Sequence, residues 1–269
     1  MAHDRIDTDP ATARRLWNDA ADAYHHFVET GLDYYRTDLH GPALLDACGD
    51  VRERRVLDLG CGQGWFTRQL AAAGAQVTGV DWSHGLIEHA RAIEEARHFR
   101  AGELAGGVTY DVLDAADIAT HFAPDTFDLV TACMSLMDMP SPGAVLAAAA
   151  RLAPRIVFSI PSPVTDAPHR VWKRDASGTK LALEIDRYFD ATTTVMQWNM
   201  KRLVHHFATV QYRYTLEQWS RMIEDAGLVI ARLREPRPSE AAIAKRPELA
   251  DAARLPYFLI VDACRSRAA

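Results

Sequence analysis

The stretch of residues 55–67, RVLDLGCGQGWFT, constrains the fold of this chain most. Residues 56–59 have the length and apolar character of a buried strand, and the residues from Trp65 onward are typical of the start of a helix. Three glycines separate these two parts at alternate positions: Gly60, Gly62 and Gly64. Glycine permits a sharp turn with positive φ and leaves no Cβ between the backbone and a ligand. The pattern therefore predicts a strand–turn–helix unit whose backbone N–H groups face a bound molecule.

The spacing of the glycines narrows the choice of ligand. A dinucleotide fingerprint, G-x-G-x-x-G, requires a third glycine where this sequence has the bulky Trp65. A phosphate-binding P-loop requires G-K-[ST], which does not follow. We therefore expect a small adenosine-like ligand with an amino-acid tail, and the alternative is an ordinary tight strand–helix turn.

The segment VLDLGCGQG closely resembles the glycine-rich signature of class I S-adenosylmethionine (SAM) methyltransferases of the small-molecule type, similar to methyltransferase domains 11 and 25. The resemblance covers residues 55–161 specifically and residues 215–264 more loosely. It implies SAM as the cofactor and methyl transfer (EC 2.1.1) as the reaction. The β-α order of the chain independently predicts a doubly wound, Rossmann-like α/β sheet with its ligand across the carboxyl ends of the strands.

A chain of 269 residues fits one such domain, 1–269, with elaborations. We expect an N-terminal helical cap at 11–50, a SAM-binding core at 51–161, and a lid or substrate insertion at 162–204 after the fifth strand. A C-terminal helix and hairpin are expected at 205–265, the last strand being antiparallel, with a capping box formed by Thr215 and Gln218. Long insertions are usually functional, and four residues are candidates to line an acceptor pocket: Trp172, Tyr188, Trp198 and Met200.

The clearest cofactor residue outside the glycine loop is Asp81, which ends the β-type run Gln76–Asp81. A carboxylate at the tip of the second strand accepts hydrogen bonds from both ribose hydroxyls. Trp82 follows and is expected to pack on the adenine face, the alternative being a surface aromatic residue. The resemblance implies that Asp114 and Ala115 recognise the adenine edge, although Asp114 also suits the N-cap of a short helical turn.

Further cofactor contacts are expected from the fourth strand and from the N-terminal helices. The resemblance implies that Met134 floors the SAM pocket. Arg36 is expected to pair with the SAM carboxylate and Tyr24 to line the methyl site, whereas Cys61 is expected to serve as a small loop residue. The full set expected to bind the cofactor is Gly60, Cys61, Gly62, Gly64, Asp81, Trp82, Asp114, Ala115, Met134, Tyr24 and Arg36.

The chemistry of SAM sets what the rest of the site must supply. Its methyl group is already electrophilic, so alignment of the acceptor provides much of the acceleration, and a base is needed only for a poor nucleophile. The candidates are His205 and His206, with Asp138 behind them. Adjacent histidines on a strand point to opposite faces, so at most one enters the pocket, and a non-catalytic role remains the alternative for each.

Several function classes are disfavoured by what the sequence lacks. No N/D-P-P-Y/F tetrad follows the fourth strand, and no acidic set for a catechol-type metal site is evident, which favours a metal-independent small-molecule methyltransferase. The net charge of −6 disfavours a large nucleic-acid footprint. The four cysteines are scattered, and no apolar run approaches the roughly 20 residues of a membrane span. We expect a cytoplasmic protein, monomeric or homodimeric, without nucleic-acid or membrane partners.

Two other readings stay open from the sequence. One is a SAM-binding enzyme that catalyses a reaction other than methyl transfer, and the other is a non-catalytic SAM-binding protein. A dehydrogenase is the weaker alternative, because Trp65 disfavours a dinucleotide.

Overall fold

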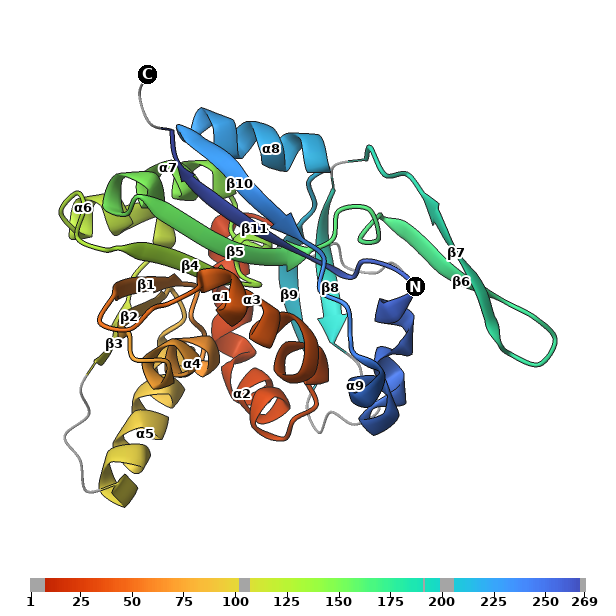
Figure 1. The fold of residues 1–269 in the computed structure, drawn as a ribbon, viewed down its shortest axis with the longest axis horizontal. Helices are drawn as coiled ribbons and strands as arrows, with labels where there is room; N and C mark the ends of the chain where they lie inside the picture. Colours follow the sequence, from red (N-terminus) through yellow and green to blue (C-terminus); the bar gives the residue numbers. More distant parts are fainter. Residues whose placement is uncertain (1–7, 102–106, 191, 199–205, 267–269) are drawn as a thin grey trace.

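The computed structural model describes residues 8–101, 107–190, 192–198 and 206–266. Its centre is a seven-stranded sheet in the order β10-β11-β5-β4-β1-β2-β3 (Figure 1). The strands are β1 (Arg55–Leu59), β2 (Gln76–Asp81), β3 (Val108–Val112), β4 (Leu129–Cys133), β5 (Arg155–Pro161), β10 (Leu228–Arg234) and β11 (Phe258–Arg265). The first five are parallel, and β11 runs antiparallel to both of its neighbours. This confirms the predicted doubly wound sheet with an antiparallel last strand.

The strand order places the candidate site. From β1 the chain adds β2 and β3 on one side and β4 and β5 on the other. The direction of winding therefore reverses between β1 and β4, and a crevice forms at the carboxyl ends of the strands at such a point.

Helices cover both faces of the sheet, and the strand side chains alternate accordingly. Leu57 and Leu59 pack with α6 (Ile118–His121), α7 (Pro142–Leu152) and α8 (Leu216–Asp225). Val56 packs on the opposite face with α3 (Gly41–Cys48) and α4 (Trp65–Ala72). The helix α5 (His84–Ala101) packs along β2 and β3. Burial on both faces explains why residues 56–59 read as a nearly continuous apolar run.

Four helical segments precede the sheet, where the sequence predicted helices: α1 (Pro10–Asp19), α2 (Ala21–Glu29), the π-helical turn η1 (Arg36–His40) and α3. The helix α1 begins at Pro10, because Asp9 accepts a hydrogen bond from the Thr12 N–H and Pro10 has no backbone N–H that would need an acceptor.

The insertion after β5 forms two antiparallel pairs. The hairpin of β6 (His169–Arg174) and β7 (Lys180–Asp186) extends away from the body (Figure 1). The strand β8 (Thr193–Trp198) pairs with β9 (Phe207–Tyr212), which packs against α1 and against the short turn η3 (Leu136–Asp138). This arrangement brings the insertion to the carboxyl edge of the sheet.

The sequence missed two elements after β10. The segment between the two strands of the expected C-terminal hairpin contains α9 (Glu240–Lys245) and the 3-10 helix η4 (Pro247–Ala253). Ser239 caps α9 by accepting a hydrogen bond from the Ala242 N–H. These turns are short and lack the long apolar stripe that reveals a helix in a sequence. In the part of the chain that the structure describes, no helix is long and apolar enough to cross a membrane.

Candidate active site

The glycine loop adopts the strained turn that its sequence predicts. Gly60, Gly62 and Gly64 have φ values of 61°, 57° and 83°. A Cβ on Gly60 would lie 2.5 Å from the Cβ of Ser135, so the loop and the segment after β4 approach as closely as they do only because residue 60 is glycine. Gly64 instead packs against Tyr110 and Arg68, so its role is structural.

Asp81 joins the glycine loop to the end of β2. Its Oδ2 accepts a hydrogen bond from the Gly62 N–H at 2.9 Å, and its Oδ1 accepts one from the Ser83 N–H at 2.8 Å. The residue is 8% exposed. Burial raises the pKa of Asp81 to about 6, although the two backbone N–H groups stabilise the charged form. Each oxygen keeps lone pairs for a further donor.

A cavity of about 240 Å³ opens at the carboxyl ends of β1, β2 and β4. Ten of the eleven residues expected to bind the cofactor line it: Tyr24, Arg36, Gly60, Cys61, Gly62, Asp81, Trp82, Asp114, Ala115 and Met134. The exception is Gly64. Asp114 also caps the turn η2 (Ala115–Asp117), because its Oδ1 accepts a hydrogen bond from the Ala116 N–H at 3.0 Å. The position of Asp114 is therefore compatible both with binding the adenine edge and with capping a helical turn.

The sequence did not single out some of the lining residues. Pro10, Trp17 and Leu113 also line this cavity. Trp17 gave only the signal of an apolar helix face, and its place beside the cavity depends on how α1 docks on the sheet.

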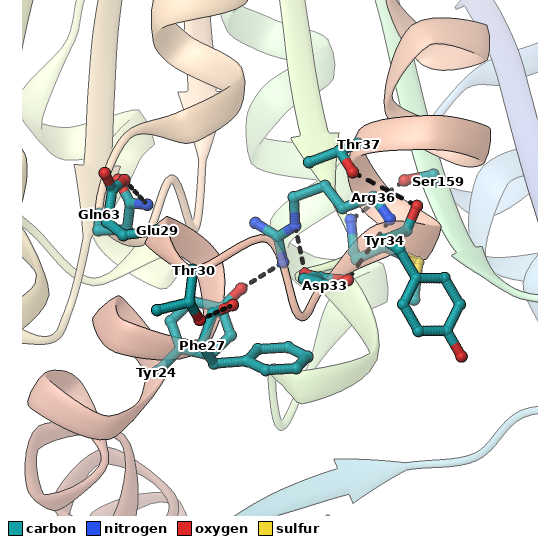
Figure 2. Close-up of polar contacts among 11 residues, drawn as sticks. Tyr24, Phe27, Glu29, Thr30, Asp33, Tyr34, Arg36, Thr37, Gln63 and Ser159 are labelled. Atoms are coloured by element: carbon teal, nitrogen blue, oxygen red, sulfur yellow. Dashed lines mark hydrogen bonds and ion pairs between the residues drawn. The ribbon is translucent and has the colours of Figure 1, made fainter. Parts of the chain in front are cut away.

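Arg36 and Tyr24 meet at the wall of this cavity (Figure 2). The Arg36 guanidinium donates a hydrogen bond to the Tyr24 hydroxyl oxygen, and its Nε lies 2.8 Å from Asp33 Oδ2. The Arg36 side chain is 11% exposed. Burial raises the pKa of Tyr24 above its usual value, so the phenol is neutral. The remaining guanidinium N–H groups are available to a ligand carboxylate.

A second polar contact holds α2 on the glycine loop. Gln63 Nε2 donates a hydrogen bond to Glu29 Oε1 at 3.1 Å (Figure 2), and Arg68 donates to Gln63 Oε1 at 2.6 Å. The helix α2 is thus tied to the glycine loop through the Gln63 side chain.

A second cavity, of about 470 Å³, lies between the end of β4 and the insertion. Its wall is largely aromatic and methionine-rich: Tyr35, Trp172, Trp198, Tyr257, Phe258, Met134, Met137 and Met196. Trp172 and Trp198 are where the sequence placed them. Tyr188 is elsewhere and accepts a hydrogen bond from the Leu216 N–H at 2.9 Å, and Met200 lies outside the described residues.

The two cavities share Met134 and Asp138 in their walls. Met134 has a positive φ of 54°, which is unusual for a residue with a side chain and is typical of functional sites. Burial raises the pKa of Asp138 well above its usual value, and the nearby carboxyls of Asp81 and Asp166 act in the same direction.

The histidine candidates, unlike Asp138, are not found in the wall of either cavity among the described residues. His206 is exposed and lines neither cavity, so the geometry gives no support to a catalytic role for it. The next residue, Phe207, is the one buried at this point of the chain. His205 lies outside the described residues. Within the described ranges, no three His, Cys, Asp or Glu side chains form a group able to hold a metal ion.

Comparison with known proteins decides the family. Residues 24–233 match a family described as a methyltransferase domain. An S-adenosylmethionine-dependent methyltransferase from Mesorhizobium loti is 30% identical, with a TM-score of 0.68 over 83% of this chain and 96% of that one. The chain belongs to the SAM-dependent methyltransferase family. Its cofactor is accordingly SAM, which suits the glycine loop and the acid on β2.

One more distant structure agrees in fold, and one relative matches part of the sequence. The magnesium protoporphyrin IX methyltransferase of Synechocystis, solved with bound SAM, is 20% identical and has a TM-score of 0.57 over 98% of this chain and all of that one. A ubiquinone biosynthesis O-methyltransferase from Burkholderia cenocepacia is 37% identical over 109 residues, which is 40% of this chain. The match spans only 43% of that relative's length.

Proposed function

We propose that this protein transfers the methyl group of SAM to a small, largely apolar acceptor held in the second cavity. The observation that carries the proposal is the junction of the two cavities at Met134 and Asp138. A cofactor in the first cavity with its sulfonium at this junction presents its methyl group to whatever occupies the second. Alignment of the two reactants supplies much of the acceleration.

The first cavity contains the groups that SAM requires. The Asp81 carboxylate accepts hydrogen bonds from the ribose hydroxyls, and Trp82 packs on the adenine. Asp114 and the backbone of Ala115 bind the adenine edge, and Arg36 pairs with the carboxylate of the amino-acid tail.

Asp138 is the group we assign to the acceptor proton. Its carboxyl has no hydrogen-bond or ion-pair partner among the described residues, and its raised pKa makes it a stronger base than an exposed acid. For a hydroxyl acceptor, the O–H proton passes to Asp138, the oxygen forms the new bond to carbon, and S-adenosylhomocysteine leaves with the electron pair of the broken S–C bond. A role for His205 or His206 and the independence from a metal stay predictions.

Calorimetric titration with SAM, S-adenosylhomocysteine and NAD tests the cofactor assignment. We expect the first two to bind and NAD to bind at least 10-fold more weakly. A preference for NAD would overturn the assignment.

Incubation with methyl-labelled SAM and a panel of phenols, naphthols and aryl amines tests the reaction. We expect labelled product from at least one acceptor, and Asp138→Asn is expected to lower kcat for a hydroxyl acceptor by about 10²–10⁴-fold. Turnover of SAM without labelled product would favour a different reaction. Tight binding without any turnover would favour a non-catalytic binding protein.

A further inference from the structure

Gln211 is a buried amide in the wall of the second cavity with half of its hydrogen-bonding capacity unused. It lies on β9 and is 6% exposed. Its Nε2 donates a hydrogen bond to Asp166 Oδ2 at 3.2 Å. Its Oε1 is fully buried and has no hydrogen-bond partner among the residues that the structure describes. A buried carbonyl oxygen without a donor is unfavourable and is uncommon in folded proteins.

The orientation of this amide follows from the charges around Asp166. Arg170 Nη1 lies 3.0 Å from Asp166 Oδ1, and Arg213 Nε lies 3.3 Å from Asp166 Oδ2. Burial raises the pKa of Asp166, whereas the two guanidinium groups act in the opposite direction and favour the carboxylate, which only accepts hydrogen bonds. The NH₂ of Gln211 must therefore face Asp166, and the carbonyl oxygen must face away from it.

Three other polar side chains of the cavity wall have hydrogen bonds within the protein. The Thr209 hydroxyl oxygen accepts a hydrogen bond from Trp198 Nε1 at 3.0 Å. The Thr165 hydroxyl donates to the Pro256 carbonyl oxygen, and the Tyr35 hydroxyl donates to the Glu248 carbonyl oxygen at 3.3 Å. None of these groups supplies a hydrogen to Gln211 Oε1.

Asp138 presents a second unused acceptor to the same cavity. It lies on η3, against which β9 packs. Gln211 and Asp138, each with an unused oxygen acceptor, thus both line the second cavity, whose wall is otherwise mostly aromatic and methionine-rich. A molecule that fits this wall must bring polar hydrogens of its own.

We propose that Gln211 determines acceptor specificity: the acceptor is an aromatic molecule with two polar hydrogens, one on the atom that receives the methyl group and a second, on a hydroxyl or N–H, that Gln211 Oε1 accepts. This inference rests on the proposed function of the second cavity. The first hydrogen faces Asp138, and the second selects among apolar molecules of similar size. Asp166 is the positioning residue that holds the amide in this orientation.

Paired naphthalene probes test this inference. Each dihydroxynaphthalene isomer is titrated against the naphthol that lacks one hydroxyl, with the protein saturated with S-adenosylhomocysteine. Quenching of the fluorescence of Trp172 and Trp198 reports binding, because both side chains line the cavity. We expect at least one dihydroxynaphthalene to bind at least 10-fold more tightly than its naphthol.

Gln211→Met removes the acceptor while keeping the length of the side chain. We expect the ratio of the two affinities to fall to within about 2-fold of unity, through weaker binding of the dihydroxynaphthalene alone. Gln211→Asn, which withdraws the carbonyl by one methylene, is a second variant expected to reduce the ratio. Met196→Leu is the matched control, because Met196 lies opposite Thr209 in the same wall and offers no such acceptor.

The outcomes separate this inference from the proposed function. An unchanged ratio in both Gln211 variants, equal binding of each probe pair to the wild-type protein, or binding of neither probe would overturn the role of Gln211. Failure of the wild-type protein to bind S-adenosylhomocysteine would instead overturn the proposed function. The variants are compared only where their affinity for S-adenosylhomocysteine matches that of the wild type, because matched affinity shows that the first cavity is folded.

Discussion

Replacing Asp81 by asparagine tests the link between the glycine loop and the cofactor. Both carboxylate oxygens accept backbone N–H groups, from Gly62 at 2.9 Å and Ser83 at 2.8 Å. Asparagine has one acceptor oxygen and one NH₂ donor, so one of the two backbone N–H groups would face another donor. The ribose would also lose one hydrogen bond to a charged acceptor.

Two terms of opposite sign set the effect of Asp81→Asn on stability. An unsatisfied buried N–H costs about 1–3 kcal/mol. The pKa of Asp81 is raised to about 6, so keeping the buried carboxyl ionised at neutral pH costs about 3 kcal/mol, which the neutral amide avoids. These terms largely cancel, and we expect the melting temperature to change by only a few degrees.

The effect on cofactor binding has no such compensation. A hydrogen bond to a charged group contributes about 1.5–3 kcal/mol, which corresponds to roughly 10- to 150-fold weaker binding of S-adenosylhomocysteine at pH 8. Calorimetric titration measures this loss. Asp117→Asn is the matched control, because Asp117 is an exposed acid close in sequence to the same cavity.

The pH dependence gives a second readout for Asp81. The ligand prefers the ionised carboxylate, so binding lowers its pKa, and wild-type affinity should rise as the pH increases through about 6 and then level off. Arg14, Asp114, Asp58 and Asp138 are charged or ionisable groups that also interact with Asp81. The Asp81→Asn variant should lose this rise. Binding within 3-fold of the wild type at pH 8, or an unchanged rise, would refute the role of Asp81.

Three further predictions concern single contacts. Arg36→Met should weaken binding of S-adenosylhomocysteine by about 10-fold or more, because a charged hydrogen bond is lost. Methylthioadenosine lacks the carboxylate, so its binding should stay within about 2-fold of the wild type. Equal losses for both ligands in calorimetry would contradict a carboxylate contact. Gly64→Ala should lower the melting temperature more than Gly227→Ala. Both positions have positive φ, but only a Cβ on Gly64 would meet Tyr110 and Arg68. Equal shifts in melting temperature would contradict the steric argument. Thr215→Ala removes the capping box of α8 and should cost about 1 kcal/mol of stability in a urea titration, whereas Thr215→Ser should cost less than half of that; no measurable loss would contradict the capping role.

Much of the lining of the first cavity was predictable, because the sequence signals for it are local. The glycine turn depends on backbone sterics within a few residues, and Asp81 was found because the end of a short β-type run fixes the end of a strand. The strand β2 has the predicted bounds, and the capping box of Thr215 forms as expected.

The region from the insertion to the C-terminus was less predictable, because residues that pack together there are distant in sequence. Nothing near residue 206 indicates that His206 is exposed and Phe207 buried, since that depends on how the chain enters β9. The short helices α9 and η4 were missed for a similar reason, because their apolar residues cover neighbouring segments and do not form a long stripe.

The sequence by itself determined the fold, the turn that approaches the cofactor and the acid on β2, because each is set by short-range sterics or by the end of a strand. Only the tertiary structure decided that two cavities meet at Met134 and Asp138, and that Asp166 orients an amide 45 positions away. Those relations arise when the insertion folds back against the sheet, and the packing of distant side chains determines them.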